Sequence, residues 1–216
     1  MRKEDYGIVL KSFFPYKQKI SILFRNTGKV LLVVPSVKDA QRLLSGMKIS
    51  CNKSRFGDGF SGNGFSILQV PLFNHGNLGW IHLLLEICYY FVQIEDISFD
   101  IFDLLEFCLN LVSKSNLFGK FFYVVQKLCV LKLLFLLSFY PPRNLVFCDN
   151  VFQCIVSISV DSKNCGQVSS TDKLFVSFDD EMLKQIDKWI LQCIAKHPQC
   201  AMFKTCNFLK TGCQTI

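Results

Sequence analysis

The chain has 216 residues, of which half are apolar and 19% are charged. This length and composition allow a sizeable buried core and exclude a disordered, collagen-like or low-complexity protein. The net charge is +7, but it is unevenly spread. Residues 1–55 hold twelve Lys or Arg and three Asp or Glu, a balance of +9, whereas residues 56–216 balance to −2. This asymmetry predicts a polyanionic partner bound by the first quarter of the chain.

From Tyr6 to Asn74 the sequence favours β-strands. Five runs rich in β-branched and aromatic residues are separated by turn signals, and they predict a small closed or partly open barrel. The run Gly57-Asp-Gly-Phe-Ser-Gly62 spells a dinucleotide-binding pattern, but a strand-like run rather than a helix follows it, so we expect a loop between barrel strands. The five predicted strands are Tyr6–Phe14, Lys19–Phe24, Lys29–Val34, Met47–Asn52 and Phe65–Phe73.

After Gly79 the apolar residues follow helical spacing. Asp100, Asp103, Glu106 and Asn110 fall three or four residues apart. This spacing predicts a single solvated polar stripe on an otherwise apolar helix over residues 100–112.

Two further helices are predicted near the end of the chain. Residues 121–139 are apolar nearly all round, which is typical of the central helix of a bundle. An amphipathic helix is expected from about residue 180 to Pro198, with Ser and Asp side chains capping its first amides. Residues 145–178 return to short strand-like runs and predict a small irregular or β insert.

The sequence predicts a cytoplasmic protein without membrane contact. No secretory signal is visible. The apolar stretches Leu78–Ile94 and Phe121–Tyr140 contain charged residues, among them Lys127 and Lys132 in the second. A lysine at mid-bilayer costs about 2.5–3.5 kcal/mol, so both stretches are expected to be buried helices. The number of cysteines, eleven, is odd, and several of them lie in apolar segments. We therefore expect reduced thiols and no disulfide framework.

Neither a metal site nor an active site is predicted. Zinc sites usually contain C-x2-C pairs, and this sequence has none. Cys148, Cys154 and Cys165 are therefore only weak candidate ligands, and we expect no cofactor. None of the three histidines lies in a motif of nucleophilic or metal-dependent catalysis. We therefore expect a protein that is not an enzyme.

The basic residues of the predicted barrel form the candidate binding site. Phe13, Phe14, Tyr16 and Phe56 are interleaved with these cations, and Asp39 is the single acid between them. Basic barrels with available aromatic side chains hold single strands by neutralising phosphates and stacking bases. The candidate nucleic-acid-binding residues are Lys11, Lys17, Lys19, Arg25, Lys29, Lys38, Arg42, Lys48, Lys53 and Arg55.

Several stretches carry a resemblance to a known family. They are Tyr6-Gly-Ile-Val-Leu-Lys11 with the strand and turn that follow it, Leu131–Pro141 before Cys148, and Met202–Leu209 after His197. These look like the opening strands, the central helix with its stop, and the C-terminal segment of the RecO family of bacterial recombination mediators.

The resemblance implies an α+β fold in which an N-terminal OB-fold β-barrel (1–75) is followed by a helical domain (76–216) with an insert at about 145–178. It implies binding of single- and double-stranded DNA, strand annealing, and help in loading recombinase on strands coated by SSB. RecR and the SSB C-terminal tail are the implied partners, at a nucleoid-associated location. The tail is expected on the helical domain, with Lys127 and Lys132 as candidate contacts.

Two alternatives of other classes stay open at this point. The exposed Phe and Leu surfaces of a protein-interaction module would dock other proteins, with a barrel that does not bind DNA. An OB barrel also accepts RNA, so an RNA-binding protein fits the same pattern.

Overall fold

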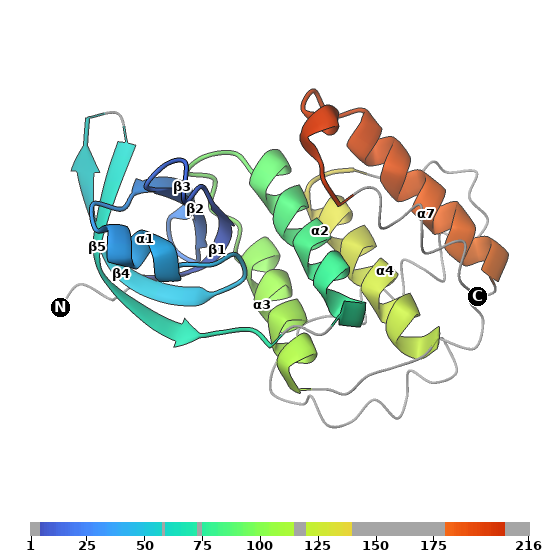
Figure 1. Cartoon of the computed structure of the whole chain (residues 1–216). Helices are drawn as coiled ribbons and strands as arrows, with labels where there is room; N and C mark the ends of the chain where they lie inside the picture. Colours follow the sequence, from blue (N-terminus) through green and yellow to red (C-terminus); the bar gives the residue numbers. More distant parts are fainter. Residues whose placement is uncertain (1–4, 58, 73–74, 115–119, 140–179, 206–216) are drawn as a thin grey trace. The chain divides into compact units, whose positions relative to one another are not determined.

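The computed structural model describes residues 5–57, 59–72, 75–114, 120–139 and 180–205 (Figure 1). It contains two compact units, Met1–Ser113 and Lys114–Ile216. The predicted insert at 145–178 lies outside the described residues. The change from strands to helices falls near residue 75, as predicted, but the helices that directly follow the barrel belong to the same compact unit as the barrel.

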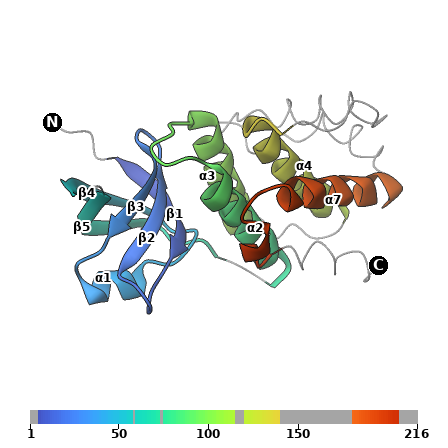
Figure 2. The same ribbon diagram turned by 90° about the horizontal axis from the view of Figure 1, so that it is seen from above.

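The first unit begins with a closed five-stranded barrel (Figure 2). Its strands are ordered β1-β2-β3-β5-β4, and the β3–β5 pair is parallel whereas the other pairs are antiparallel. The short helix α1 (Val37–Arg42) lies between β3 and β4 in the chain. This arrangement is OB-like and confirms the predicted barrel. The strands are β1 (Tyr6–Ser12), β2 (Lys19–Phe24), β3 (Gly28–Val33), β4 (Lys48–Phe56) and β5 (Gly59–Gln69).

Alternating apolar residues fill the barrel interior. Ile20, Ile22 and Phe24 of β2 point inward together because every second side chain of a strand faces the same side. Residues from every strand join them in one buried cluster, which also includes residues from α1 and the turns around it. The cluster consists of Val9, Ile20, Ile22, Phe24, Val30, Leu32, Val34, Ala40, Leu43, Met47, Ile49 and Phe65.

The glycine-rich run is part of a β-hairpin, so it has no helix after it and cannot be a dinucleotide-binding loop. Strand β4 continues to Phe56, and β5 begins at Gly59, six residues before the predicted strand start at Phe65. Cross-strand pairing such as Arg55↔Phe60 stabilises this extended hairpin despite the low strand propensity of glycine. Helix α1 was not predicted; it is short, and Ser36 caps it by accepting from the amide of Asp39.

Helices α2 (His75–Phe91) and α3 (Phe99–Lys114) complete the first unit. Ile8 and Leu23 lie on the outer side of the barrel wall, and yet both are fully buried. Helix α2 packs on β1, and Phe102 of α3 meets the ring of Tyr6 edge-on with centroids 5.5 Å apart. The helices therefore cover one outer face of the barrel.

The second unit contains α4 (Lys120–Leu136), α7 (Asp180–Ala195) and the 3₁₀ turn η1 (Cys200–Met202). Both helices were predicted, and they pack against each other. The buried face of α7 carries Ile186, Trp189 and Ile190, as expected of an amphipathic helix, and in addition Asp187. No helix in the described part of the chain combines the length and apolar character needed to cross a bilayer.

Candidate nucleic-acid interface

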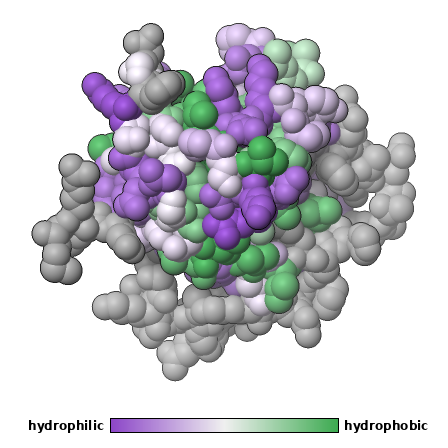
Figure 3. Space-filling model, turned by 60° about the vertical axis from the view of Figure 1, so that its left-hand side comes forward, coloured by the Kyte–Doolittle hydropathy of each residue, from purple (hydrophilic) through white to green (hydrophobic). Residues whose placement is uncertain are grey.

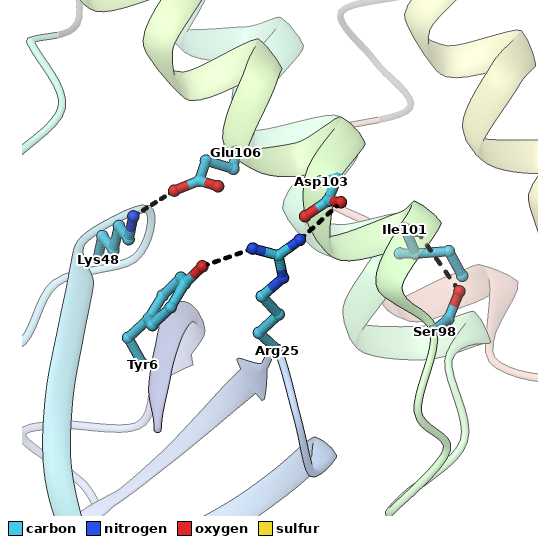
Figure 4. A network of polar contacts seen from close by, with 7 residues as sticks. All are labelled: Tyr6, Arg25, Lys48, Ser98, Ile101, Asp103 and Glu106. Carbon is cyan, nitrogen blue, oxygen red and sulfur yellow. Dashed lines mark hydrogen bonds and ion pairs between the residues drawn. The ribbon is translucent and has the colours of Figure 1, made fainter. Parts of the chain in front are cut away.

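Three of the four residues of the polar stripe on α3 contact the barrel. Asp103 accepts from the guanidinium of Arg25 at 3.0 Å, and Glu106 pairs with the ammonium of Lys48 (Figure 4). The next residue of the stripe, Asn110, accepts from the amide of Gln69 at 3.1 Å. The expectation of a solvated stripe therefore holds for Asp100, which is exposed, and is wrong for Asp103, Glu106 and Asn110. The spacing correctly places these groups on one helix face, but their partners lie far away in the sequence, on strands β4 and β5 and in the turn after β2.

Arg25 and Lys48 are thus engaged within the protein. The hydroxyl of Tyr6 accepts a second bond from Arg25 at 2.9 Å. This hydrogen bond, supported by the charge of Asp103 and opposed by partial burial, raises the pKa of Arg25. The Lys48 ammonium also lies 4.4 Å from the centre of the Tyr6 ring. Both cations stabilise the contact between the barrel and α3.

Two more candidate cations pair with nearby acids. Lys53 of β4 lies 2.7 Å from the carboxylate of Asp5, which also accepts from the hydroxyl of Thr27. Arg42 of α1 pairs with Asp39 at 2.8 Å and donates to the backbone carbonyl of Phe65. These side chains connect elements of the barrel, so their charge is largely compensated.

Lys29 and Lys11 both lie at the contact between the barrel and α2, near Tyr89. The ammonium of Lys29 is buried and donates to the carbonyl of Tyr89 at 2.8 Å. That carbonyl is in the last turn of α2, where helix carbonyls have no N–H donor within the helix. The negative end of the helix dipole also favours a cation there. Burial lowers the pKa of Lys29. The Lys11 ammonium lies 4.5 Å from the centre of the Tyr89 ring.

Lys17, Lys19 and Lys38 remain exposed and make no ion pair with any described residue. They lie at one end of the barrel, because Lys19 pairs with Val33 and the carbonyl of Gln18 accepts from Val34, just before α1. Tyr16 is 92% exposed in the same loop. We call Tyr16, Lys17, Lys19 and Lys38 the cationic loop end. Figure 3, with the barrel side forward, shows hydrophilic clusters separated by apolar surface.

Arg55 is a separate exposed cation on the β4–β5 hairpin. Its guanidinium lies 5.9 Å from the centre of the Phe60 ring, which faces it across the hairpin. Of the ten predicted binding residues, Arg55 and the three lysines of the cationic loop end are the ones that the fold leaves to solvent without a paired acid in the described residues.

A sequence signal for this internal pairing was present. Residues 56–113 contain seven Asp or Glu and no Lys or Arg. Residues 1–113 therefore hold twelve basic and ten acidic side chains, a balance of only +2. The acidic stretch that follows the basic one folds against it, so part of the asymmetry reflects a contact within the protein.

The two candidate residues of the second unit differ in their surroundings. Lys127 is buried and pairs with Asp187, which also accepts from the hydroxyl of Tyr123 at 3.4 Å. Lys132 is half-buried. Lys127 is therefore engaged in the contact between α4 and α7 and is not available to a partner in this arrangement.

The weak zinc candidates Cys148, Cys154 and Cys165 lie outside the described residues. Within the described part of the chain, no three potential ligands gather into a metal-binding group. Burial raises the pKa of the Cys51 and Cys193 thiols to about 11 and that of Cys88 to about 12. Such thiols carry little thiolate near neutral pH and are correspondingly unreactive.

We expect Cys200, whose side chain is exposed, to be alkylated by iodoacetamide at pH 8 well before Cys51 and Cys193. A pKa raised from an ordinary thiol value to about 11 lowers the thiolate fraction roughly a hundredfold. The rates at Cys51 and Cys193 should keep rising with pH up to about 11. Peptide mass mapping over time measures each site, and equal rates at all three would contradict the prediction.

Comparison with protein-family models and with curated proteins found no match for this chain.

Proposed function

We propose that this protein is a non-enzymatic DNA-binding protein that holds single strands at the cationic loop end of its barrel. The observation that carries the proposal is the grouping of three exposed lysines with the almost fully exposed ring of Tyr16 on an OB-like barrel. Ammonium groups neutralise phosphates, and an exposed ring offers a face on which a base stacks.

The site that we propose is smaller than the ten residues that the sequence indicated. Arg25, Arg42, Lys48 and Lys53 are compensated by carboxylates, and Lys29 is buried. We therefore assign phosphate contacts to the cationic loop end, with Arg55 as an additional contact. Helices α2 and α3 cover one face of β1 and β2. A DNA strand cannot reach that face in this arrangement.

We further propose that the protein acts as a mediator of recombinational repair that resembles RecO. This role is based on the sequence resemblance. Its activities would be strand annealing, binding of double-stranded DNA, cooperation with RecR, recombinase loading and binding of the SSB tail. Lys127 is buried and paired, so it is not part of the proposed contact with the tail. An annealing assay with complementary oligonucleotides, and calorimetry with an SSB-tail peptide, test these activities separately.

Fluorescence anisotropy with a labelled oligothymidylate is expected to show binding that weakens steeply with salt. Each neutralised phosphate contributes about −0.7 to the slope of log K against log salt for single strands. Three or four contacts therefore give a slope of about −2 to −3. Charge reversal by Lys17→Glu with Lys19→Glu is expected to weaken binding by about tenfold or more, because it replaces attraction by repulsion at two phosphates.

The matched control is Lys184→Glu with Lys188→Glu, which makes the same charge change on exposed positions of α7 in the second unit. The control should bind nearly as well as the unmodified protein. A slope near zero, or equal loss in both variants, would contradict the assignment. Titration with a labelled oligouridylate beside the DNA distinguishes the RNA-binding alternative.

A further inference from the structure

The connection between α2 and α3 exposes large apolar side chains. Ile94, Ile97 and Phe99 are 66%, 50% and 51% exposed, and they fall within six residues. A single exposed apolar side chain needs no explanation, but a local group of them is typical of a surface that another molecule covers.

The barrel holds this connection in place. Ile94 forms a parallel bridge with Lys29 of β3, and the amide of Glu95 donates to the carbonyl of Lys29 at 2.8 Å. The backbone carbonyl of Asp96 lies against Gly28, where an added Cβ would come within 2.2 Å of it. The apolar side chains are therefore presented on a backbone that is already ordered, which lowers the entropic cost of binding.

Acidic residues alternate with these apolar ones along the connection. Glu95, Asp96 and Asp100 are exposed, and they belong to the 56–113 stretch that lacks Lys and Arg. The rest of the protein carries an excess of positive charge. A phosphate backbone or an acidic peptide tail would be repelled here, whereas a cationic segment would be attracted.

We propose that residues 94–100 form a docking surface for a basic peptide segment of a partner protein, one in which Lys or Arg side chains flank apolar ones. Ile94, Ile97 and Phe99 provide the apolar contact, and the carboxylates select the charge of the partner. This site lies apart from the cationic loop end in the sequence, and its charge is negative where that of the cationic loop end is positive. The inference therefore does not depend on the proposed DNA binding.

The probe is a labelled amphipathic peptide composed of Leu and Lys, and fluorescence anisotropy with the full chain measures its binding. Ile97→Ser with Phe99→Ser is expected to weaken binding by about tenfold, because hot-spot apolar contacts are removed. Asp96→Asn with Asp100→Asn should also weaken binding and reduce its salt dependence. The matched control is Leu72→Ser, a change at a 72% exposed leucine outside this surface, which should leave binding unchanged.

A matched peptide of Leu and Glu should not bind. The proposal is overturned if the Leu–Lys peptide does not bind the unmodified protein, if the Leu–Glu peptide binds equally, or if the variants of this surface bind like Leu72→Ser. The variants of the 94–100 surface are expected to bind oligothymidylate as well as the unmodified protein does. The double variant Lys17→Glu with Lys19→Glu is expected to bind the Leu–Lys peptide as well as the unmodified protein does. Failure here is thus distinguishable from failure of the proposed DNA binding.

Discussion

Replacing Asp187 with Asn should lower the free energy of unfolding of the second unit by about 3–5 kcal/mol. Asp187 and Lys127 each have side chains only 5% exposed, and they pair where α4 packs on α7. The substitution keeps the size of the side chain but leaves the Lys127 ammonium buried without its counter-charge, which is more costly than the loss of an exposed pair.

Urea denaturation, monitored by the fluorescence of Trp189, measures this effect. Trp80 is replaced by Phe so that the fluorescence signal comes from α7 alone. Lys188→Met, a change at the adjacent exposed position, is the matched control and should alter stability by less than about 0.5 kcal/mol. Replacing both members of the pair, by Lys127→Met with Asp187→Leu, should recover most of the lost stability, because no unpaired charge remains. If Asp187→Asn and the control behave alike, the pair does not stabilise the unit.

Gly28→Ala is expected to destabilise the first unit by about 2–4 kcal/mol. Gly28 has φ +72°, and its added Cβ would lie 2.2 Å from the carbonyl oxygen of Asp96. A non-glycine residue in this conformation costs about 1–2 kcal/mol by itself. The remainder comes from displacing the backbone of the α2–α3 connection, which cannot move without breaking its bonds to β3.

Gly57→Ala separates these two contributions. Gly57 has φ +57°, but nothing lies within 4 Å of its added Cβ. This control should therefore show only the conformational cost of about 1–2 kcal/mol. Denaturation followed by Trp80 of α2, in a background with Trp189 replaced by Phe, reports on the first unit. If Gly28→Ala and Gly57→Ala are equally stable, the backbone of the α2–α3 connection does not restrict the side chain at position 28.

The elements of the fold were largely predictable because their signals are local. The five strands and the helices α3, α4 and α7 follow from periodicity within each segment. The early start of β5 was missed, since glycines at 59, 62 and 64 lower the propensity of a strand that pairing with β4 nevertheless stabilises. Helix α1 has only six residues, too few for a clear helical period.

The candidate site was harder to predict because it depends on contacts between distant residues. The spacing of Asp103 and Glu106 correctly indicated one helix face, but spacing cannot show whether that face meets water or Arg25 and Lys48. In the same way, the sequence gives no indication that Lys29 is buried under α2. Exposure of Lys17 and Lys19 agrees with the expectation for a loop and for the end of a strand.

The covering of the barrel by α2 and α3 has a consequence for the choice of fragments in binding studies. A fragment ending at residue 75 would hold twelve basic and four acidic side chains, a balance of +8, in place of +2 for residues 1–113. It would also expose the outer apolar side chains Ile8 and Leu23. Such a fragment would attract any polyanion and would aggregate readily, so affinities measured on it would describe a surface that the intact protein keeps covered.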